Sequence, residues 1–161
     1  MLLTWTLQGL WVSFTASAAW AAITATSRVD LGVFTIIGFI IWAFGYIFEL
    51  LADAQKSEFK ANPENKGKFI QSGLWSLSRH PNYFGEIIIW IGVAVVGFPV
   101  LSGWALLVLI SPLWVVAQLT LISGIPMLEK KADKRWGGQE DYEQYKMNTP
   151  VLIPRVHFGK K

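Results

Sequence analysis

Residues 31–51 read LGVFTIIGFIIWAFGYIFELL, an apolar run of 21 residues whose one charged side chain is Glu49. A helix needs about 20 apolar residues to cross the hydrocarbon core of a bilayer, because it rises about 1.5 Å per residue. The run lacks the polar–apolar alternation of a barrel strand, and a spanning segment must satisfy its own backbone hydrogen bonds. It therefore predicts a transmembrane α-helix.

Three further apolar stretches have the length of a membrane span. Of the 161 residues, 53% are hydrophobic and 16% are charged, whereas soluble domains carry about 25% charged residues. Residues 17–22 resemble a signal-peptide cleavage site, but no Lys or Arg precedes them, so we expect a retained helix. We predict a single all-α, polytopic membrane domain over residues 1–161, with about four transmembrane helices at 2–24, 31–51, 83–100 and 104–126.

The basic residues predict the topology. Thirteen of the 14 Lys and Arg lie in the 52–82 loop or in the 127–161 tail, and the other is Arg28. The positive-inside rule places the loop and the tail in the cytoplasm, and the N-terminus with them. We therefore expect an N-in/C-in integral membrane protein. The net charge of +3 does not indicate nucleic acid as a partner, because the cations lie where membrane topology requires them.

Composition also narrows the chemistry. The chain has no Cys, which excludes disulfides, thiolate metal ligands and cysteine nucleophiles. Its two histidines, His80 and His157, are too few and too far apart for a histidine-based metal cluster. We expect no metal site.

The stretch Ser78-Arg-His-Pro-Asn-Tyr-Phe-Gly-Glu86 stands at the start of the third predicted span. Pro81 fits the first helical position, so free N–H groups and the positive end of the helix dipole lie beside Arg79, which favours an anion. Asn82 and Glu86 share one helix face, and an ionisable residue in a span needs a partner or a water-filled cavity. The alternative is that Arg79 reaches lipid phosphates and Glu86 caps the helix.

A second polar face ends the second predicted span. Glu49 and Asp53 are four residues apart, and Lys56 and Lys60 continue on much the same side. Taken alone, these residues fit a ladder of ion pairs that marks the exit from the membrane. Taken with the Ser78–Glu86 stretch, they fit a nucleotide cofactor entering from the cytoplasm. Carboxylates and amides suit sugar hydroxyls or a carboxamide, and cations suit phosphates.

A third polar patch follows the fourth predicted span. Residues 123–126 (Ser-Gly-Ile-Pro) predict a break or kink, and Glu129 comes directly after it. Tyr142 and Tyr145 are three residues apart and either line a cofactor pocket or lie in the membrane interface. The short apolar segments 69–70 and 74–77 cannot span, and we expect them in the interface, with Trp75 at headgroup depth.

Five segments of the chain carry a family resemblance. Residues 49–56 (ELLADAQK), 73–75 (GLW), 78–86 (SRHPNYFGE), 123–130 (SGIPMLEK) and 152–154 (LIP) resemble the C-terminal domain of the steroid 5-alpha-reductase family. The match is closest to its bacterial branch and covers about residues 40–155. Arg-His-Pro-x-Tyr is shared with isoprenylcysteine and phospholipid methyltransferases, so alone it marks only the superfamily. The resemblance implies a bacterial inner-membrane location.

The resemblance also implies a membrane-embedded NADPH site, with Arg79, Lys56 and Lys60 as candidates for binding its phosphates. The chain departs from steroid reductases at Glu49, where they carry Asn, and at Ser57, where they carry a phosphate-binding Arg. Family members have about seven spans, and the early spans hold the substrate carbonyl and donate the proton. This chain starts near the fourth span, so we expect a partner subunit or a homo-oligomer to supply the missing helices.

The leading hypothesis is an NADPH-dependent oxidoreductase that acts on CH–CH groups of an enone or other lipid-like substrate in lipid metabolism. One alternative is an S-adenosylmethionine-dependent membrane methyltransferase, and another is a non-catalytic membrane subunit. The partners expected are the lipid bilayer and a lipophilic small molecule, and no residue is nominated as catalytic. The cofactor-binding candidates are Glu49, Asp53, Lys56, Lys60, Arg79, His80, Asn82, Tyr83, Glu86, Glu129, Tyr142 and Tyr145.

Overall fold

A computed structural model describes residues 2–26 and 30–155, and this part of the chain is helical with no β-strand. Arg28, His157, Lys160 and Lys161, which entered the charge and metal arguments, lie outside the described residues. Three described segments are long and apolar enough to cross a membrane: Val33–Ala61, Pro81–Val100 and Gly103–Trp136. The prediction of an all-α integral membrane protein is confirmed.

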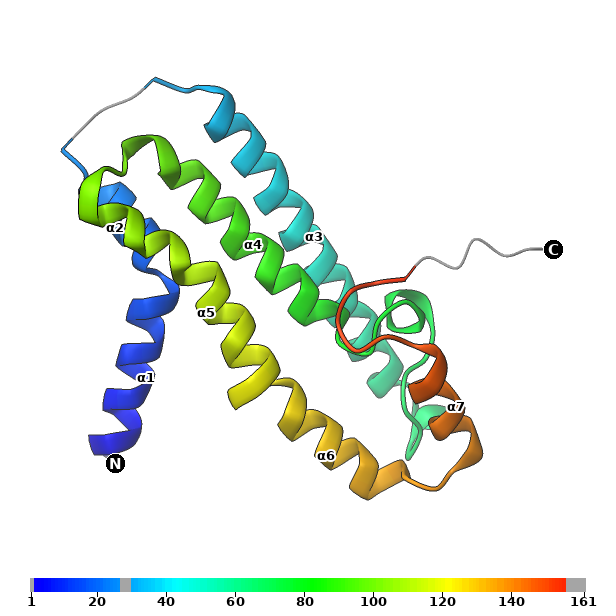
Figure 1. The fold of residues 1–161 in the computed structure, drawn as a ribbon. Helices are drawn as coiled ribbons and strands as arrows, with labels where there is room; N and C mark the ends of the chain where they lie inside the picture. Colours follow the sequence, from blue (N-terminus) through cyan, green and yellow to red (C-terminus); the bar gives the residue numbers. More distant parts are fainter. Residues whose placement is uncertain (1, 27–29, 156–161) are drawn as a thin grey trace.

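The antiparallel pair of α3 (Val33–Ala61) and α4 (Pro81–Gly97) forms the centre of the fold (Figure 1). Glycines let the two backbones approach closely. A Cβ atom added to Gly85 would lie 2.7 Å from the Cβ of Glu49, and one added to Gly45 would lie 2.7 Å from the backbone N of Ile89. The pair therefore tolerates no side chain at these crossing points.

The N-terminal segment differs from the prediction of one span over 2–24. It consists of α1 (Leu2–Thr15) and α2 (Ser17–Thr24), which are separated at Ala16. The Ser17 hydroxyl donates to the Phe14 carbonyl oxygen at 2.8 Å, and such side-chain bonds compete with the backbone ladder and bend helices. Neither piece alone reaches the length of a span.

The last long segment returns beside α4. After η3 (Phe98–Val100), only residues 101–102 interrupt the helical chain, which confirms the predicted tight hairpin. The chain continues through η4 (Gly103–Ile110), α5 (Ser111–Ala117), the π-helical η5 (Gln118–Ile122) and α6 (Ile125–Trp136). The predicted kink is present at residues 123–124, where the π-helical turn ends. The helical chain runs on to Trp136, ten residues past the predicted boundary.

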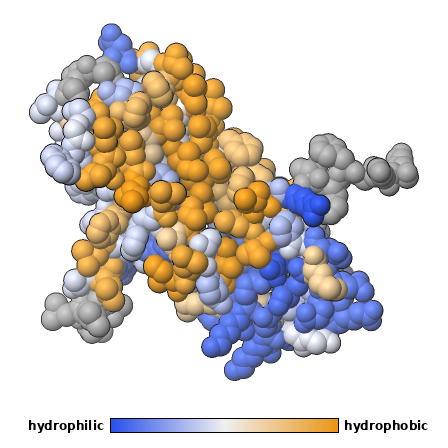
Figure 2. Space-filling model, in the orientation of Figure 1, coloured by the Kyte–Doolittle hydropathy of each residue, from blue (hydrophilic) through white to orange (hydrophobic). Residues whose placement is uncertain are grey.

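Polar residues gather at one end of the helix pair, which we call the polar end and define as residues 53–82 and 127–155. Figure 2 shows this end as a hydrophilic region beside the apolar surface of the spans. It holds the last two turns of α3, η1 (Pro63–Asn65), η2 (Gly73–Ser76), α6 and α7 (Glu140–Asn148). Trp75 is 4% exposed here, because it packs inside the polar end. The Trp75 ring therefore does not face lipid headgroups, and the membrane depth of residues 74–77 stays a prediction.

Candidate functional site

A cavity of about 540 Å³ opens in the polar end, between the end of α3, the 65–70 loop, η2, α6 and α7. This volume falls in the range of ordinary ligand pockets. Its lining has a strong charge bias, since Glu129 is its one acidic residue among the described residues. The basic lining residues are Lys56, Lys60, Lys66, Lys68, Arg79, Lys131 and Arg135.

Glu129 organises one wall of the cavity. Its carboxylate accepts from His80 Nε2 at 2.8 Å and forms an ion pair with Arg79, with 2.6 Å between Arg79 Nη1 and the other carboxylate oxygen. Because a carboxylate only accepts hydrogen bonds, the contact places the proton of His80 on Nε2. The Arg79 side chain is 12% exposed, so this is a partly buried ion pair between α6 and the residues that precede α4. Glu129 thus fixes the direction of both side chains at the cavity.

Aromatic rings form a second wall. The Phe69 ring lies 5.8 Å from Trp136, 5.3 Å from Tyr142 and 5.5 Å from Tyr145, measured between ring centroids. The Trp136 indole N–H donates to the carbonyl oxygen of Gly67 at 2.6 Å. This bond ties the 65–70 loop to α6, so the loop and the helix present their rings together.

Trp75 joins the third side of the cavity to α3. Its indole N–H donates to the Ala52 carbonyl oxygen at 2.9 Å, and its own carbonyl oxygen accepts from the Tyr145 hydroxyl at 2.6 Å. The Lys56 ammonium lies 4.4 Å from the Trp75 ring centroid, within the range of a cation–π contact. These contacts hold the lysine at the cavity mouth.

Tyr142 and Tyr145 both line the cavity. This agrees with the first of the two alternatives from the sequence, a place in the wall of a pocket. Burial, followed by the hydrogen bond that the phenol donates to Asp133 at 2.8 Å, raises the pKa of Tyr142. Burial raises the pKa of Tyr145. Both phenols therefore stay protonated at neutral pH and add no negative charge to the cavity.

The C-terminal segment closes the back of the site. Arg79 N donates to the Pro150 carbonyl oxygen at 2.9 Å, and Arg155 N donates to that of Leu77 at 2.9 Å. The buried Ser78 hydroxyl donates to the carbonyl oxygen of Leu152 at 2.8 Å. These bonds join chain segments about 70 residues apart, so the residues before α4 are held from both sides.

The other predicted site residues lie deeper along the helix pair and do not line the cavity. Glu49, Asp53 and Glu86 are near enough to interact electrostatically, and we call these three the carboxylate group. Tyr83 interacts with this group and stacks on His80, with ring centroids 5.7 Å apart. Asn82 lies in the first turn of α4, outside the cavity lining.

The twelve candidate residues therefore divide into two neighbouring groups. Lys56, Lys60, Arg79, His80, Glu129, Tyr142 and Tyr145 lie at the cavity, and the rest lie in or beside the carboxylate group. Sequence reasoning missed Phe69, Trp136, Lys131 and Arg135 as cavity residues. The i, i+4 spacing of Lys131 and Arg135 was a usable signal, because it repeats that of Lys56 and Lys60.

The cationic and aromatic side chains of the cavity indicate which class of ligand it can bind. Lys and Arg side chains around a cavity bind polyanions such as phosphates, and ring faces stack on flat heterocycles. Among the described residues, no cluster of His, Cys, Asp or Glu is placed to hold a metal ion. The fold and the site define an integral membrane protein with a basic, aromatic ligand cavity at one end of its spans.

The chain belongs to the family described as "Protein of unknown function (DUF1295)", which it matches over residues 1–149. It is 26% identical over 121 residues to a 3-oxo-5-alpha-steroid 4-dehydrogenase 1 of Rattus norvegicus, covering 75% of this chain and 41% of that protein. It is 35% identical over 104 residues to the Delta(14)-sterol reductase erg24 of Schizosaccharomyces pombe, covering 55% and 24%. The resemblance to the steroid reductase superfamily is confirmed.

A third relative has another description. The chain is 41% identical over 69 residues to a probable O-methyltransferase ustE of Ustilaginoidea virens, covering 43% of this chain and 24% of that protein. No solved structure matches the chain. The chain spans between a quarter and two fifths of the length of these curated relatives.

Proposed function

We propose that this chain is the cofactor-binding part of a membrane-embedded, NADPH-dependent reductase that acts on an enone or other lipid-like substrate. The observation that carries the proposal is the cavity of the polar end. It combines seven cationic side chains with four aromatic rings that lie in contact or near contact: Phe69, Trp136, Tyr142 and Tyr145. A dinucleotide offers phosphates to the cations and flat rings to the aromatic side chains.

Unmet polar atoms support the fit to a phosphate-bearing cofactor. Arg79 Nε is a buried donor without a hydrogen-bond partner among the described residues, whereas His80 Nδ1, which also has no partner there, can only accept when the proton is on Nε2. A buried donor without a partner costs about 1 to 3 kcal/mol, so a ligand that meets it gains affinity. We propose that Arg79, Lys56 and Lys60 bind phosphate oxygens, with Lys131 and Arg135 completing the ring of charge.

The carboxylate group suits the other half of the cofactor. Carboxylates accept from ribose hydroxyls and from a carboxamide N–H. Glu49, Asp53 and Glu86 lie next to the cations along the helix pair, on the side away from the cavity. When bound, NADPH supplies a hydride for the carbon β to a carbonyl. The task of these residues is to orient the cofactor and, with the rings of the cavity, to exclude water.

Orientation and assembly belong to the same proposal. We propose that the polar end faces the cytoplasm of a bacterial inner membrane, because the basic residues concentrate there. We propose also that a lipophilic substrate enters from the bilayer. A partner subunit or a second copy supplies helices that the longer relatives contain.

One observation favours a second candidate function, an S-adenosylmethionine-dependent methyltransferase. It is the 41% identity over 69 residues to the protein named as a probable O-methyltransferase. The charge of the cavity favours the first candidate, because S-adenosylmethionine carries a sulfonium cation and no phosphate. A non-catalytic membrane subunit that kept the fold is the third.

Isothermal titration of the purified chain in detergent separates the three. We expect micromolar binding of NADPH and no binding of S-adenosylmethionine. Micromolar binding of S-adenosylmethionine alone would establish the second candidate. Absence of binding by both, together with recovery of the chain in a larger complex, would establish the third.

A further inference from the structure

The last long segment leaves the membrane at the start of α6. Gly103–Trp136 has 34 residues, more than the roughly 20 that cross the hydrocarbon core, so its last part must lie outside the core. Counted from Gly103, η4 rises about 16 Å at about 2.0 Å per residue, and α5 adds about 10 Å. With η5 these elements cover a core of about 30 Å, so α6 begins in the headgroup region.

Three exposed residues share the outer face of α6. Met127, Lys130 and Lys134 are spaced by three and four residues, which places them along one side of the helix. Met127 is 51% exposed, and Leu121 and Ile122 before the kink are 75% and 61% exposed. The exposed surface therefore changes from apolar side chains to two lysines at the depth where headgroups replace hydrocarbon.

The two acidic residues of α6 are engaged elsewhere. Glu129 lines the cavity, and the carboxylate of Asp133 accepts from the ammonium of Lys146 on α7 at 2.6 Å. Neither Lys130 nor Lys134 forms an ion pair within the described part of the chain. Both ammonium groups are therefore available to an anion from outside the protein.

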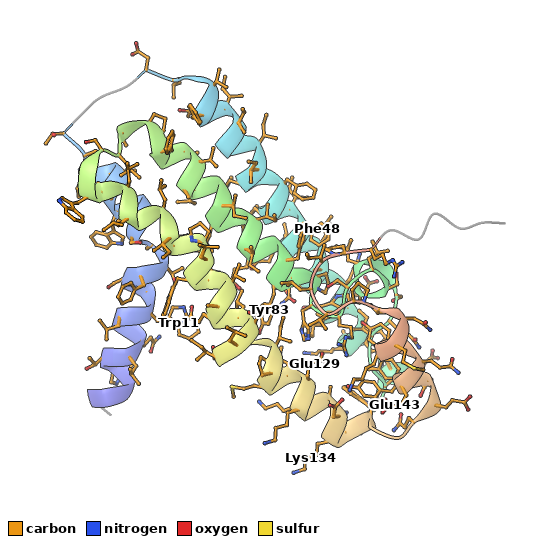
Figure 3. The ribbon with its side chains drawn as sticks, viewed as in Figure 1. Trp11, Phe48, Tyr83, Glu129, Lys134 and Glu143 are labelled. Carbon is orange, nitrogen blue, oxygen red and sulfur yellow. The ribbon has the colours of Figure 1, made fainter. Side chains whose placement is uncertain are left out.

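The other two cations of α6 belong to the cavity. Lys131 and Arg135 line it, and the Arg135 guanidinium lies 4.8 Å from the Trp136 ring centroid. Lys130 and Lys134 are absent from this lining, and Figure 3 shows Lys134 pointing away from α7. Thus α6 has two cationic faces, one towards the cavity and one towards the surroundings of the bundle.

Helix geometry directs the outer lysines back to the membrane. The bond from Cα to Cβ tilts towards the N-terminus of a helix, and the N-terminus of α6 is its membrane end. A lysine stem of four methylenes can lie along apolar surface while its ammonium reaches a polar layer. The stems of Lys130 and Lys134 can therefore follow Met127 towards the headgroups.

The end of α3 shows the contrast. This helix runs into the same polar end, but the cations of its last turns, Lys56 and Lys60, line the cavity. Its exposed residues there include Asp53 and Glu58, which repel an anion. Of these two helices, α6 alone presents an unpaired cationic face next to an apolar one.

We propose that the outer face of α6 is a docking surface for an anionic phospholipid of the surrounding membrane. The lipid phosphate lies at Lys130 and Lys134, and its acyl chains lie along the exposed apolar side chains that precede them. A soluble phosphate would leave the apolar part of the surface uncovered. A zwitterionic lipid brings a cation of its own, so two unpaired lysines favour a headgroup with a net negative charge. The surface is separate from the cavity and does not depend on the proposed reductase function.

The test is native mass spectrometry of the purified full chain in a neutral detergent, titrated with dioleoylphosphatidylglycerol or dioleoylphosphatidylcholine. A lysine near an anionic lipid surface is worth about fivefold in affinity, so we expect the unaltered chain to prefer phosphatidylglycerol at least tenfold. K130Q/K134Q should reduce this preference to less than about threefold. K131Q/R135Q removes the same charge from the cavity face and should change the preference less than about threefold.

Equal affinity of the unaltered chain for the two lipids would overturn the proposal, and this comparison needs no variant. Equal loss of preference in the two double variants would also overturn it, because net charge alone would then be responsible. Glycerol 3-phosphate, titrated as the free headgroup, should not displace the phosphatidylglycerol at equal concentration. Displacement would assign the lysines to a soluble anion and contradict the docking of a lipid.

Discussion

The cavity of the polar end and the carboxylate group share the same two helices yet carry opposite charge. On α3, Glu49 and Asp53 come first, and Lys56 and Lys60 follow on much the same face. From Glu49 to Lys60 the axis advances about 16 Å, at 1.5 Å per residue. The site therefore changes sign with depth, from carboxylates nearer the membrane core to cations at the outer end. A dinucleotide has the same order, with its nicotinamide at one end and its phosphates towards the other.

The two regions also differ in how they are held. The carboxylate group depends on the close approach of α3 and α4 at glycines, whereas the cavity depends on hydrogen bonds between distant segments, such as Tyr145 to Trp75. A rigid helix pair can hold the reacting end of a cofactor, while loops and short helices enclose the other end. Substitutions can therefore affect one region and leave the other intact.

The largest effect is expected from a substitution that forces α3 and α4 apart. Gly85→Leu places a side chain where even a Cβ atom lies 2.7 Å from Glu49, and we expect a loss of about 3 kcal/mol or more in the free energy of unfolding. Thermal unfolding in detergent measures it. Gly9→Ala is the control, because a Cβ there meets nothing within 4 Å, and it should be neutral or slightly stabilising.

The next effect belongs to the cavity alone. Arg79→Gln removes a charge that faces the proposed phosphates, and we expect a 10- to 100-fold loss of affinity, as for a charge-assisted hydrogen bond. The loss should be the same for NADPH and for 2′-phospho-ADP-ribose, which lacks the nicotinamide. A loss for NADPH but none for the fragment would move the phosphates away from Arg79.

The carboxylate group should behave in the opposite way. Glu86→Ala and Asn82→Ala should each weaken NADPH binding by about 1 to 3 kcal/mol, because each leaves a buried polar group of the cofactor unmet. Neither should change the affinity for 2′-phospho-ADP-ribose. If both variants bind NADPH as the unaltered chain does, the cofactor does not extend to this depth.

A smaller effect is expected at the exposed rim of the cavity. Lys60→Gln should weaken NADPH binding by only about threefold, because an exposed charge pair contributes less than about 1 kcal/mol. The difference should disappear as salt is raised, since mobile ions screen exposed charges. Titrations at low and high ionic strength check this, and a loss that persists at high salt would place Lys60 deeper than the structure does.

Much of the fold could be predicted from the sequence, because span length and the placement of charge are local properties. The run at 31–51 and the break at 97–103 correspond to a helix and to a hairpin. The division of the first segment at Ala16, beside which the Ser17 hydroxyl bonds to the Phe14 carbonyl oxygen, could not be predicted, since the run is otherwise apolar and gives no break signal.

The candidate site was predicted in part. Lys56, Arg79 and Tyr142 come together at the cavity because the end of α3, the residues before α4 and the short helix α7 all lie at the polar end. The burial of Trp75 depends on its bonds to Ala52 and Tyr145, which lie 23 and 70 residues away. Contacts of that range leave no periodic signal in one sequence.

The most direct test of the central claim uses the two faces of α6. Lys131 and Arg135 line the cavity, whereas Lys130 and Lys134 do not, and Figure 3 shows Lys134 pointing away from α7. Two double variants, K131E/R135E and K130E/K134E, change the net charge equally. We predict that NADPH affinity falls at least 100-fold in the first and less than about threefold in the second. Equal losses in both variants would contradict the account, because the cavity would then have no special part in binding.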